Sequence, residues 1–203
     1  MSKQNLYGIT KKIKYHSYMG TVGKVAKNLV SRDFNAIYPN QKWTTDVTEF
    51  TCVWGKAYLS PILDMFNGEI IAYNISRRPN YEQIDSMLKI AFESHPNLEG
   101  CIIHSDQGWQ YQNYRFVNSI KEHNMLQSMS RKGNCLDNAP MESFFGVLKR
   151  EMFYDHELEF NDFDSLAREL EKYIDYYNNV RIKHSLGGLS PVKYREKIMS
   201  MIK

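Results

Sequence analysis

The chain has 203 residues, of which 42% are hydrophobic and 24% are charged. This composition is typical of a globular protein and excludes a disordered, collagen-like or low-complexity chain. No run of residues approaches the ~18 consecutive apolar positions that a membrane helix needs, and the first residues lack the apolar core of a signal peptide. The three cysteines lie far apart, which argues against a disulfide framework or a zinc site. We therefore expect a soluble, cytoplasmic protein with reduced cysteines.

The net charge of +3 is unevenly distributed along the chain. Residues 1–45 contain eight Lys and Arg and one acidic residue, a net charge of +7, whereas the remainder carries −4. Basic segments gain affinity for nucleic acid by displacing counterions, so residues 1–38 are predicted to be a basic N-terminal arm or a truncated linker. A solvated tail without a partner would have the same composition, so charge alone leaves both interpretations open.

Three segments rich in β-branched and aromatic residues follow this region, at residues 43–53, 56–66 and 69–76. A Trp-Gly pair separates the first two, and an Asn-Gly pair separates the last two. Because Asn-Gly between apolar runs is a strong signal for a tight hairpin, these segments predict a three-stranded antiparallel meander. Asp46 lies in the middle of the first strand, where aspartate is disfavoured and an unpaired buried charge is costly. We therefore expect Asp46 to have a compensating partner.

The middle of the chain alternates between helical and strand patterns. Asn80 is suited to cap a helix because Gln83 follows three residues later and apolar residues then recur at helical spacing up to His95. A short buried strand is predicted at residues 101–104, and a second helix at residues 114–123. Strands that alternate with helices predict an α/β fold with a mixed sheet.

The C-terminal part of the chain is predicted to be helical. A polar segment at residues 128–138 leads into a helix at about residues 140–153, with a proline near its first turn. A longer amphipathic helix is expected at about residues 162–179, and Ser190-Pro191 opens a last short helix. The chain is thus expected to end in three consecutive helices.

Asp106 lies just beyond the strand predicted at residues 101–104. Open α/β sheets gather ligand-binding residues at this end of their strands, so Asp106 is a candidate site residue. The alternative is a loop aspartate that accepts hydrogen bonds from its own backbone, which is common beside glycine. The residue alone does not decide between these alternatives.

Glu142 lies on the helix predicted at residues 140–153, on a different face from the apolar residues 141, 144, 145, 148 and 152. Gly146 and Lys149 share its face, and almost two helical turns separate the glutamate from the lysine. A glycine inside a helix costs roughly 1 kcal/mol relative to alanine, so the close approach of a ligand would explain it. A solvated surface helix with scattered charges is the alternative.

Three stretches together resemble the signature of the integrase catalytic core: WTTDVT at residues 43–48, HSDQGWQY at residues 104–111 and SMSRKGNCLDNAPMESFF at residues 128–145. They are similar in particular to second-reading-frame transposases of bacterial insertion sequences, which share this core with retroviral integrases. In that family an Asp, Asp, Glu triad has 35 residues between its last two members, as do Asp106 and Glu142. Lys149 occupies the position of the family's basic residue, seven places after the glutamate. The C-terminal signature of the family is resembled by YNNVRIKHSL at residues 177–186 and LSP at residues 189–191.

The resemblance implies a ribonuclease H-like α/β fold, with a mixed five-stranded sheet flanked by helices and a helical C-terminal extension. It divides the chain into a basic arm, an integrase-type catalytic core and a helical extension of that core, at residues 1–38, 39–155 and 156–203. Asp46, Asp106 and Glu142 would converge as catalytic and metal-binding residues that hold two Mg²⁺ or Mn²⁺ ions. Oxygen ligands suit these cations, which relieve the repulsion between neighbouring carboxylates.

By the same resemblance, the chain is expected to be a metal-dependent DNA transposase or integrase that cleaves DNA strands and transfers 3′-hydroxyls to target DNA during transposition of an insertion sequence. Two ions ~4 Å apart can support such an in-line phosphoryl displacement. Lys149 would hold a DNA phosphate. Three residues of the preceding loop are further candidates for DNA contact: Arg131, Lys132 and Asn134. Asp64 and Asp137 are interpreted as structural, the first as a turn residue and the second as a loop-ordering residue.

The expected partners are the element ends and target DNA, with a homo-oligomer assembled on the DNA and no membrane. About 40 residues precede the core, so an upstream-frame helix-turn-helix protein is a further expected partner that would recognise the element ends. Two alternatives remain open. One is a truncated, non-enzymatic DNA-binding or regulatory partner of a full-length transposase, and the other is a structure-selective nuclease on the same fold.

Overall fold

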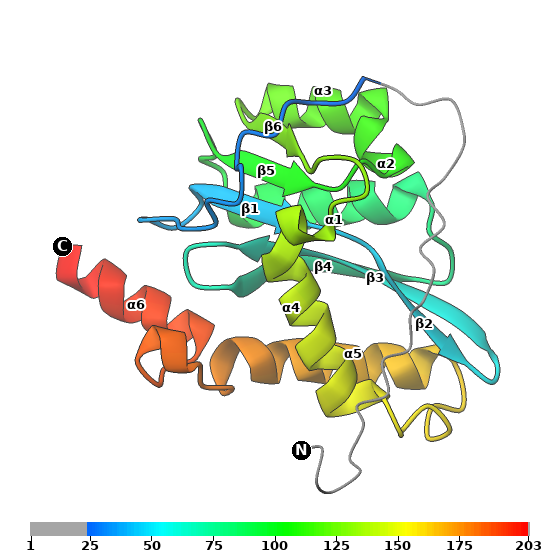
Figure 1. Ribbon diagram of the computed structural model, residues 1–203. Coiled ribbons are helices and arrows are strands. Elements are labelled where there is room, and N and C mark those ends of the chain that lie inside the picture. Colours follow the sequence, from blue (N-terminus) through cyan, green and yellow to red (C-terminus); the bar gives the residue numbers. More distant parts are fainter. Residues whose placement is uncertain (1–23, 203) are drawn as a thin grey trace, which may run out of the picture.

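The computed structural model describes residues 24–202 and shows a sheet with helices on both of its faces (Figure 1). Within these residues the strands are β1 (Lys42–Thr45), β2 (Thr48–Cys52), β3 (Gly55–Asp64), β4 (Glu69–Ser76), β5 (Ile102–Ser105) and β6 (Leu126–Met129). The α-helices are α1 (Tyr81–Ser94), α2 (Trp109–Gln112), α3 (Tyr114–Glu122), α4 (Ala139–Leu148), α5 (Phe163–Asn179) and α6 (Pro191–Ile202). Short 3-10 turns lie at Cys135–Asn138 and His184–Leu186, and a π-helical segment lies at Lys149–Phe153. None of these helices is both long enough and apolar enough to cross a membrane.

The sheet is mixed, as predicted. Its strand order is β2-β3-β1-β5-β6, and β4 also pairs with β3. The pairs of β3 with β1, β2 and β4 are antiparallel, whereas β1 with β5 and β5 with β6 are parallel. The predicted meander is therefore confirmed, and the parallel strands extend the sheet from β1.

The first predicted strand is divided into β1 and β2. Both halves pair with β3 in one continuous register, with Thr45 opposite Ile62 and Thr48 opposite Leu59. This register places Pro61 opposite Asp46, and proline lacks the N–H that a ladder hydrogen bond requires. The ladder is therefore interrupted beside Asp46, and the six strands found within residues 24–202 correspond to the five that the resemblance implied.

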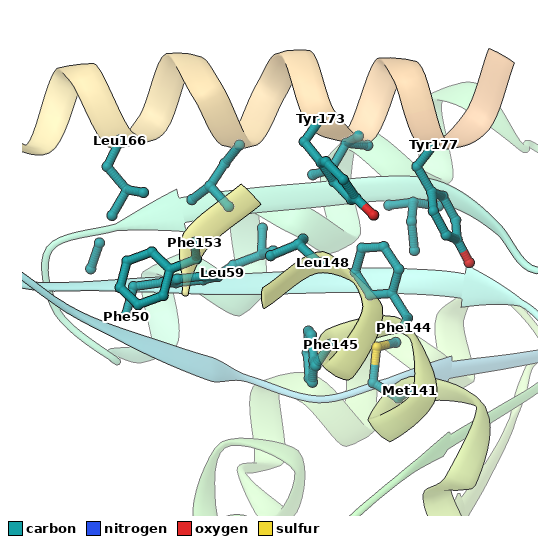
Figure 2. Packing of buried hydrophobic residues seen from close by; sticks show 14 of the residues in the cluster. Phe50, Leu59, Met141, Phe144, Phe145, Leu148, Phe153, Leu166, Tyr173 and Tyr177 are labelled. Atoms are coloured by element: carbon teal, nitrogen blue, oxygen red, sulfur yellow. The ribbon is translucent and has the colours of Figure 1, made fainter. Parts of the chain in front are cut away.

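Two hydrophobic clusters lie on opposite sides of the sheet. One joins β1, β3 and β5 to α1 and α3, and its fully buried members include Trp43, Ile103, Met87 and Phe116. The other joins β2 and β3 to α4 and α5, and Figure 2 shows Phe144 and Leu148 of α4 facing the side chains of Tyr173 and Tyr177 on α5. The fold thus has three layers, with the sheet between two layers of helices.

Local signals account for the starts of three helices. The side chain of Asn80 accepts a hydrogen bond from the backbone N–H of Gln83, so the predicted cap of α1 is confirmed. Asp162 and Ser165 form a reciprocal capping box at the start of α5. The last helix begins at Pro191, directly after Ser190, as predicted.

The helix predicted to end near residue 153 changes its winding after Leu148. At the π-helical segment the backbone N–H of Tyr154 donates to the carbonyl of Lys149. A π turn adds a residue to the helical repeat and rotates the following side chains. Phe153 thereby enters the core, where its ring lies 5.0 Å from that of Phe50 between centroids. Met152, predicted to be buried, is only partly buried.

The helices after residue 156 pack tightly on the predicted core. Leu166, Leu170 and Ile174 of α5 belong to the same cluster as the apolar residues of α4. Asn67 in the β3–β4 turn donates to the carbonyl of Pro191, at the start of α6. The boundary between residues 39–155 and 156–203 remains a prediction, but this C-terminal part contributes to one shared core.

Half of the basic residues of the N-terminal region lie outside the described residues, namely Lys3, Lys11, Lys12 and Lys14. Among those described, Lys42 forms a salt bridge with Asp33, and Arg32 forms one with Asp137, each at 2.8 Å. Val30 is buried. The segment just before β1 is therefore docked on the fold, and two positive charges of this region, Arg32 and Lys42 at the start of β1, are already paired within the chain.

The packing of α4 under α5 predicts a large loss of stability for Phe144→Ala. The ring of Phe144 is 2% exposed and meets Tyr177 edge to face, with 4.9 Å between centroids. We expect the free energy of unfolding in urea to fall by about 3–5 kcal/mol. Leu158→Ala, at an 80% exposed position, should change it by no more than about 0.5 kcal/mol. Equal losses in the two variants would contradict this packing.

Candidate active site

Parallel pairing of β1 with β5 brings Asp46 and Asp106 to the same level of the sheet. Thr44 lies opposite His104 in this pair. Two residues further along each strand, the same register sets Asp46 beside Asp106 on the same face. Neighbouring strands lie about 4.8 Å apart, so the two carboxylates are close neighbours at the carboxyl ends of their strands. Both side chains are half-buried.

The charge environment of Asp46 reflects this juxtaposition. The pKa of Asp46 is raised to about 8, chiefly by burial, and the neighbouring charges of Asp106 and, to a smaller extent, of Glu142 act in the same direction. A hydrogen bond of 2.7 Å from the backbone N–H of Val47 acts in the opposite direction. Within residues 24–202, no basic side chain forms a salt bridge with Asp46. The compensating partner expected from the sequence is therefore not a cation of the described chain.

Asp106 also has the local role of a loop aspartate. One of its carboxylate oxygens accepts a hydrogen bond of 2.8 Å from the backbone N–H of Gly108. A side-chain carbon at residue 108 would lie 2.9 Å from this same oxygen and 2.6 Å from the Gln110 side chain. Glycine is thus required for the loop to hold the Asp106 carboxylate where it is. The two interpretations of Asp106 are compatible, since the turn that satisfies the carboxylate also fixes it beside Asp46.

Asn138 connects the third carboxylate to the same strand. The Thr44 hydroxyl donates to the side-chain oxygen of Asn138, whose amide nitrogen donates to the Thr45 carbonyl at 3.4 Å. Asn138 is buried and immediately precedes α4, so these bonds fix the start of α4 on β1. Glu142 lies in the first turn of that helix, with an exposed side chain.

The sequence offered a partial signal for Asn138, because asparagine directly before a helix is a common cap. Here, however, its side chain caps no helical N–H. It reaches instead to a strand more than 90 residues earlier in the sequence. Rules based on the local sequence therefore did not identify the role of Asn138 in anchoring α4 to β1.

Asp137 orders the loop that precedes α4. Its buried carboxylate accepts two hydrogen bonds of 2.8 Å from the Arg131 guanidinium, one of 3.0 Å from the Arg131 backbone and one of 2.8 Å from Arg32. Arg131 above all holds the pKa of Asp137 well below its usual range. The loop-ordering role predicted for Asp137 is confirmed. Asp64 likewise accepts from the backbone N–H of Phe66 in the β3–β4 turn, from that of Asn40 just before β1, and from Arg195.

The four residues expected to contact DNA have different surroundings. Lys132 is exposed, and the side chain of Arg131 is 59% exposed despite its pairing with Asp137. The side-chain oxygen of Asn134 accepts from Arg32 at 3.1 Å. The Lys149 ammonium donates to a β2 backbone carbonyl at 2.8 Å, and burial lowers its pKa. DNA contact by these residues remains a prediction.

The structure brings two members of the triad, Asp46 and Asp106, next to each other. Asp46 and Asp106 are adjacent, and Glu142 is close enough for its charge to affect Asp46. In the described part of the chain, no three His, Cys, Asp or Glu side chains are gathered closely enough to hold a metal ion. Convergence of all three carboxylates therefore remains a prediction. A β-carbon added at Gly146 would meet only the end of the Arg150 side chain, at 3.2 Å, so internal packing does not require glycine there.

Comparison with known proteins places this geometry in a family. Residues 38–135 match a family model described as the integrase core domain, and residues 142–199 match a second model with that description. An uncharacterized transposase-like protein of Haemophilus influenzae is 54% identical over 197 residues, which span 96% of this chain and 89% of the relative. The chain belongs to the insertion-sequence transposases with an integrase core domain. A putative transposase for an insertion sequence element of Escherichia coli is 48% identical to this transposase over 97% of the chain and 69% of the relative.

Solved integrase cores share the fold of this transposase. The HTLV-2 integrase catalytic core domain, in complex with magnesium in a trimeric form, superposes with a TM-score of 0.63 over 79% of this chain and 99% of that chain, at 16% identity. The catalytic core domain of BIV integrase gives a TM-score of 0.60 over 81% of this chain and 99% of that chain, at 14% identity. The predicted ribonuclease H-like fold is thus confirmed.

The Asp137 network predicts a pH-dependent loss of stability for Asp137→Asn. Its pKa is depressed in the folded chain, so the charged carboxylate stabilises the fold above the unfolded-state value of 3.8, and this stabilisation is lost as pH falls through the folded value. We expect Asp137→Asn to lower the free energy of unfolding by about 2–4 kcal/mol at neutral pH. Its difference from the wild type should narrow below about pH 4 in urea titrations.

A matched control for this variant is Asp164→Asn, because the Asp164 side chain is 70% exposed. It should change stability by no more than about 0.5 kcal/mol at any pH tested. A difference between Asp137→Asn and the wild type that stays constant down to low pH would contradict the charged network.

Proposed function

We propose that this transposase cleaves DNA at the ends of an insertion sequence and joins the 3′-hydroxyls to target DNA, with Asp46, Asp106 and Glu142 as the catalytic carboxylates. The observation that carries the proposal is the parallel register that sets Asp46 beside Asp106. The anchoring of α4 to the same strand by Asn138 supports Glu142 as the third member. The site is acidic, which suits phosphoryl transfer supported by cations.

The donor set fits two Mg²⁺ or Mn²⁺ ions. Carboxylate oxygens are the ligands that these hard cations prefer, and a cation between adjacent carboxylates relieves their mutual repulsion. When bound, such ions activate an attacking water or 3′-hydroxyl and stabilise the leaving oxygen of an in-line displacement. A magnesium complex of the structurally similar HTLV-2 integrase core supports this choice.

The residues of the chain itself position the carboxylates and the DNA. Backbone N–H groups of Val47 and Gly108 orient Asp46 and Asp106. Lys149 uses one of the three ammonium protons on a backbone carbonyl, which leaves two for a DNA phosphate. In the loop before α4, Lys132 and Asn134 are the further DNA contacts of the proposal.

The Arg131 guanidinium completes this set of DNA contacts. Asp137 holds it in a fixed orientation, so it would present its remaining N–H groups to the phosphate backbone with little loss of conformational freedom.

The partners follow from this activity. This transposase would act in the bacterial cytoplasm on chromosomal or plasmid DNA, as a homo-oligomer assembled on the element ends. The HTLV-2 integrase core is described in both trimeric and dimeric forms, which supports self-association within this fold. An upstream-frame helix-turn-helix protein would contribute recognition of the ends.

A strand-transfer assay tests the proposed function. Labelled terminal-repeat DNA is incubated with Mn²⁺ and the wild type, Asp106→Asn, Glu142→Gln or the control Glu93→Gln, which replaces an exposed glutamate of α1. We expect each triad variant to lower the rate of cleavage and joining by about a thousand-fold, because several kcal/mol of transition-state stabilisation are lost. Glu93→Gln should retain the wild-type rate.

Three outcomes would contradict the proposal. Equal activity in all four proteins would exclude the catalytic assignment. Absence of cleavage and joining by the wild type, with DNA binding retained, would favour a non-enzymatic DNA-binding or regulatory partner of a full-length transposase. Cleavage without joining would instead favour a structure-selective nuclease.

A further inference from the structure

A pocket of about 300 Å³ lies beside α4. Its walls come from α4, the end of β3, the β3–β4 turn, the end of α5 and the segment that follows α5, together with Phe34 of the segment before β1. This volume accommodates a phosphate group with an attached sugar. Among its lining residues, Arg181 and Lys183 are basic and none is acidic. We call it the Lys183 pocket.

The ammonium group of Lys183 carries a charge that no acid of the described chain neutralises. It donates to the carbonyl of Gly68 at 3.1 Å and to the hydroxyl of Tyr177 at 2.7 Å. Within residues 24–202 it forms no salt bridge. Burial and the nearby Arg181 lower the pKa of Lys183 to about 8. An ammonium has three donors, so one remains for an anion in the pocket.

The charge of Arg181, the other basic residue of the pocket, is neutralised by a carboxylate. Arg181 donates three hydrogen bonds of 2.6 to 3.0 Å to the carboxylate of Glu151. This pair leaves the pocket with the single net positive charge of Lys183. The hydroxyl groups of Ser143 and Ser185 also line the pocket, and both residues are exposed. One cation with neutral hydroxyl donors suits a singly charged phosphodiester group.

The chain also makes room for this ammonium at the β3–β4 turn. A side-chain carbon at Gly68 would lie 2.5 Å from the Lys183 nitrogen, and Gly68 has a left-handed backbone conformation with φ of +70°. Glycine therefore allows Lys183 to approach the turn closely. The ammonium is held at a fixed point of the pocket wall.

The pocket lies near the proposed catalytic carboxylates, and this position indicates which anion it binds. Ser143 directly follows Glu142 on α4, so the pocket flanks the helix that carries the third catalytic carboxylate. Duplex DNA carries a charge about every 1.7 Å along its axis, so a DNA bound at the carboxylates has further phosphates within reach of this flank. We propose that the Lys183 pocket binds a backbone phosphate of the DNA substrate, an inference that rests on the proposed function.

The test is DNA affinity measured by fluorescence anisotropy, with a chelator present so that metal-dependent catalysis is silent. A duplex of about 30 base pairs is titrated at several salt concentrations with the wild type, Lys183→Met and the control Lys121→Met. Lys121 is exposed on α3, in the helical layer on the opposite side of the sheet. Lys183→Met should reduce the slope of log affinity against log salt by about 1 and weaken binding about tenfold at about 0.1 M salt. Lys121→Met should keep the wild-type slope.

A second pair of variants tests the pocket with the Lys183 hydrogen bonds intact. It is needed because Lys183→Met loses these bonds and with them part of its stability. Ser143→Glu introduces an acid into the pocket without removing those bonds, and Ser143→Gln is its neutral match. We expect Ser143→Glu to weaken DNA binding several-fold relative to Ser143→Gln, because the added charge repels a phosphate.

Three outcomes would overturn the inference. In the first, Lys183→Met keeps the wild-type slope of log affinity against log salt, and in the second, the two Ser143 variants bind DNA with equal affinity. In the third, inorganic phosphate stabilises the protein thermally in a way that depends on Lys183, while Lys183→Met and the wild type have the same salt slope for DNA. The last outcome would mean a site for a free anion. A wild type that binds no duplex would contradict the proposed function itself. If the carboxylate variants lose strand transfer but Lys183→Met binds DNA as the wild type does, only the role of the Lys183 pocket is overturned.

Discussion

The parallel pairing of β1 with β5 is the constraint on which the rest of this structure depends. It sets two carboxylates side by side at the ends of adjacent strands, where burial and like charge both disfavour ionisation of Asp46. Other features are arranged around this pair. Pro61 interrupts the ladder beside Asp46, Gly108 leaves space for the Asp106 carboxylate, and Asn138 fixes the helix of Glu142 to the same strand.

A comparison among three aspartates separates structure from chemistry. Asp64 and Asp137 are fully buried, and each is paired with an arginine at 2.7 to 2.8 Å, Arg195 and Arg131 respectively. Asp46 has no such partner within the described residues. A desolvated carboxylate without a cation costs free energy that the fold must offset, so its presence here points to a role outside folding. In this transposase, that role is proposed to be the binding of divalent ions for DNA strand transfer.

Much of the fold could be predicted from the sequence because local signals specify it. The Asn-Gly turn indicated a hairpin of the meander, and Asn80 and Ser190-Pro191 indicated the starts of two helices. Sequence reasoning failed where the structure depends on distant contacts. The edge strand β6 has the polar sequence LQSM and is a strand only because β5 pairs with it. The π turn after α4 and the reach of Asn138 to β1 likewise follow from tertiary packing.

The most direct test of the account is the binding of Mn²⁺ to the protein without DNA, followed by electron paramagnetic resonance. If Asp46 and Asp106 form the core of a metal site, the wild type takes up Mn²⁺, and Asp46→Asn lowers the affinity by about tenfold or more. Asp164→Asn, at an exposed position of α5, should bind Mn²⁺ as the wild type does. Mn²⁺ affinity that is unchanged by Asp46→Asn would contradict the account.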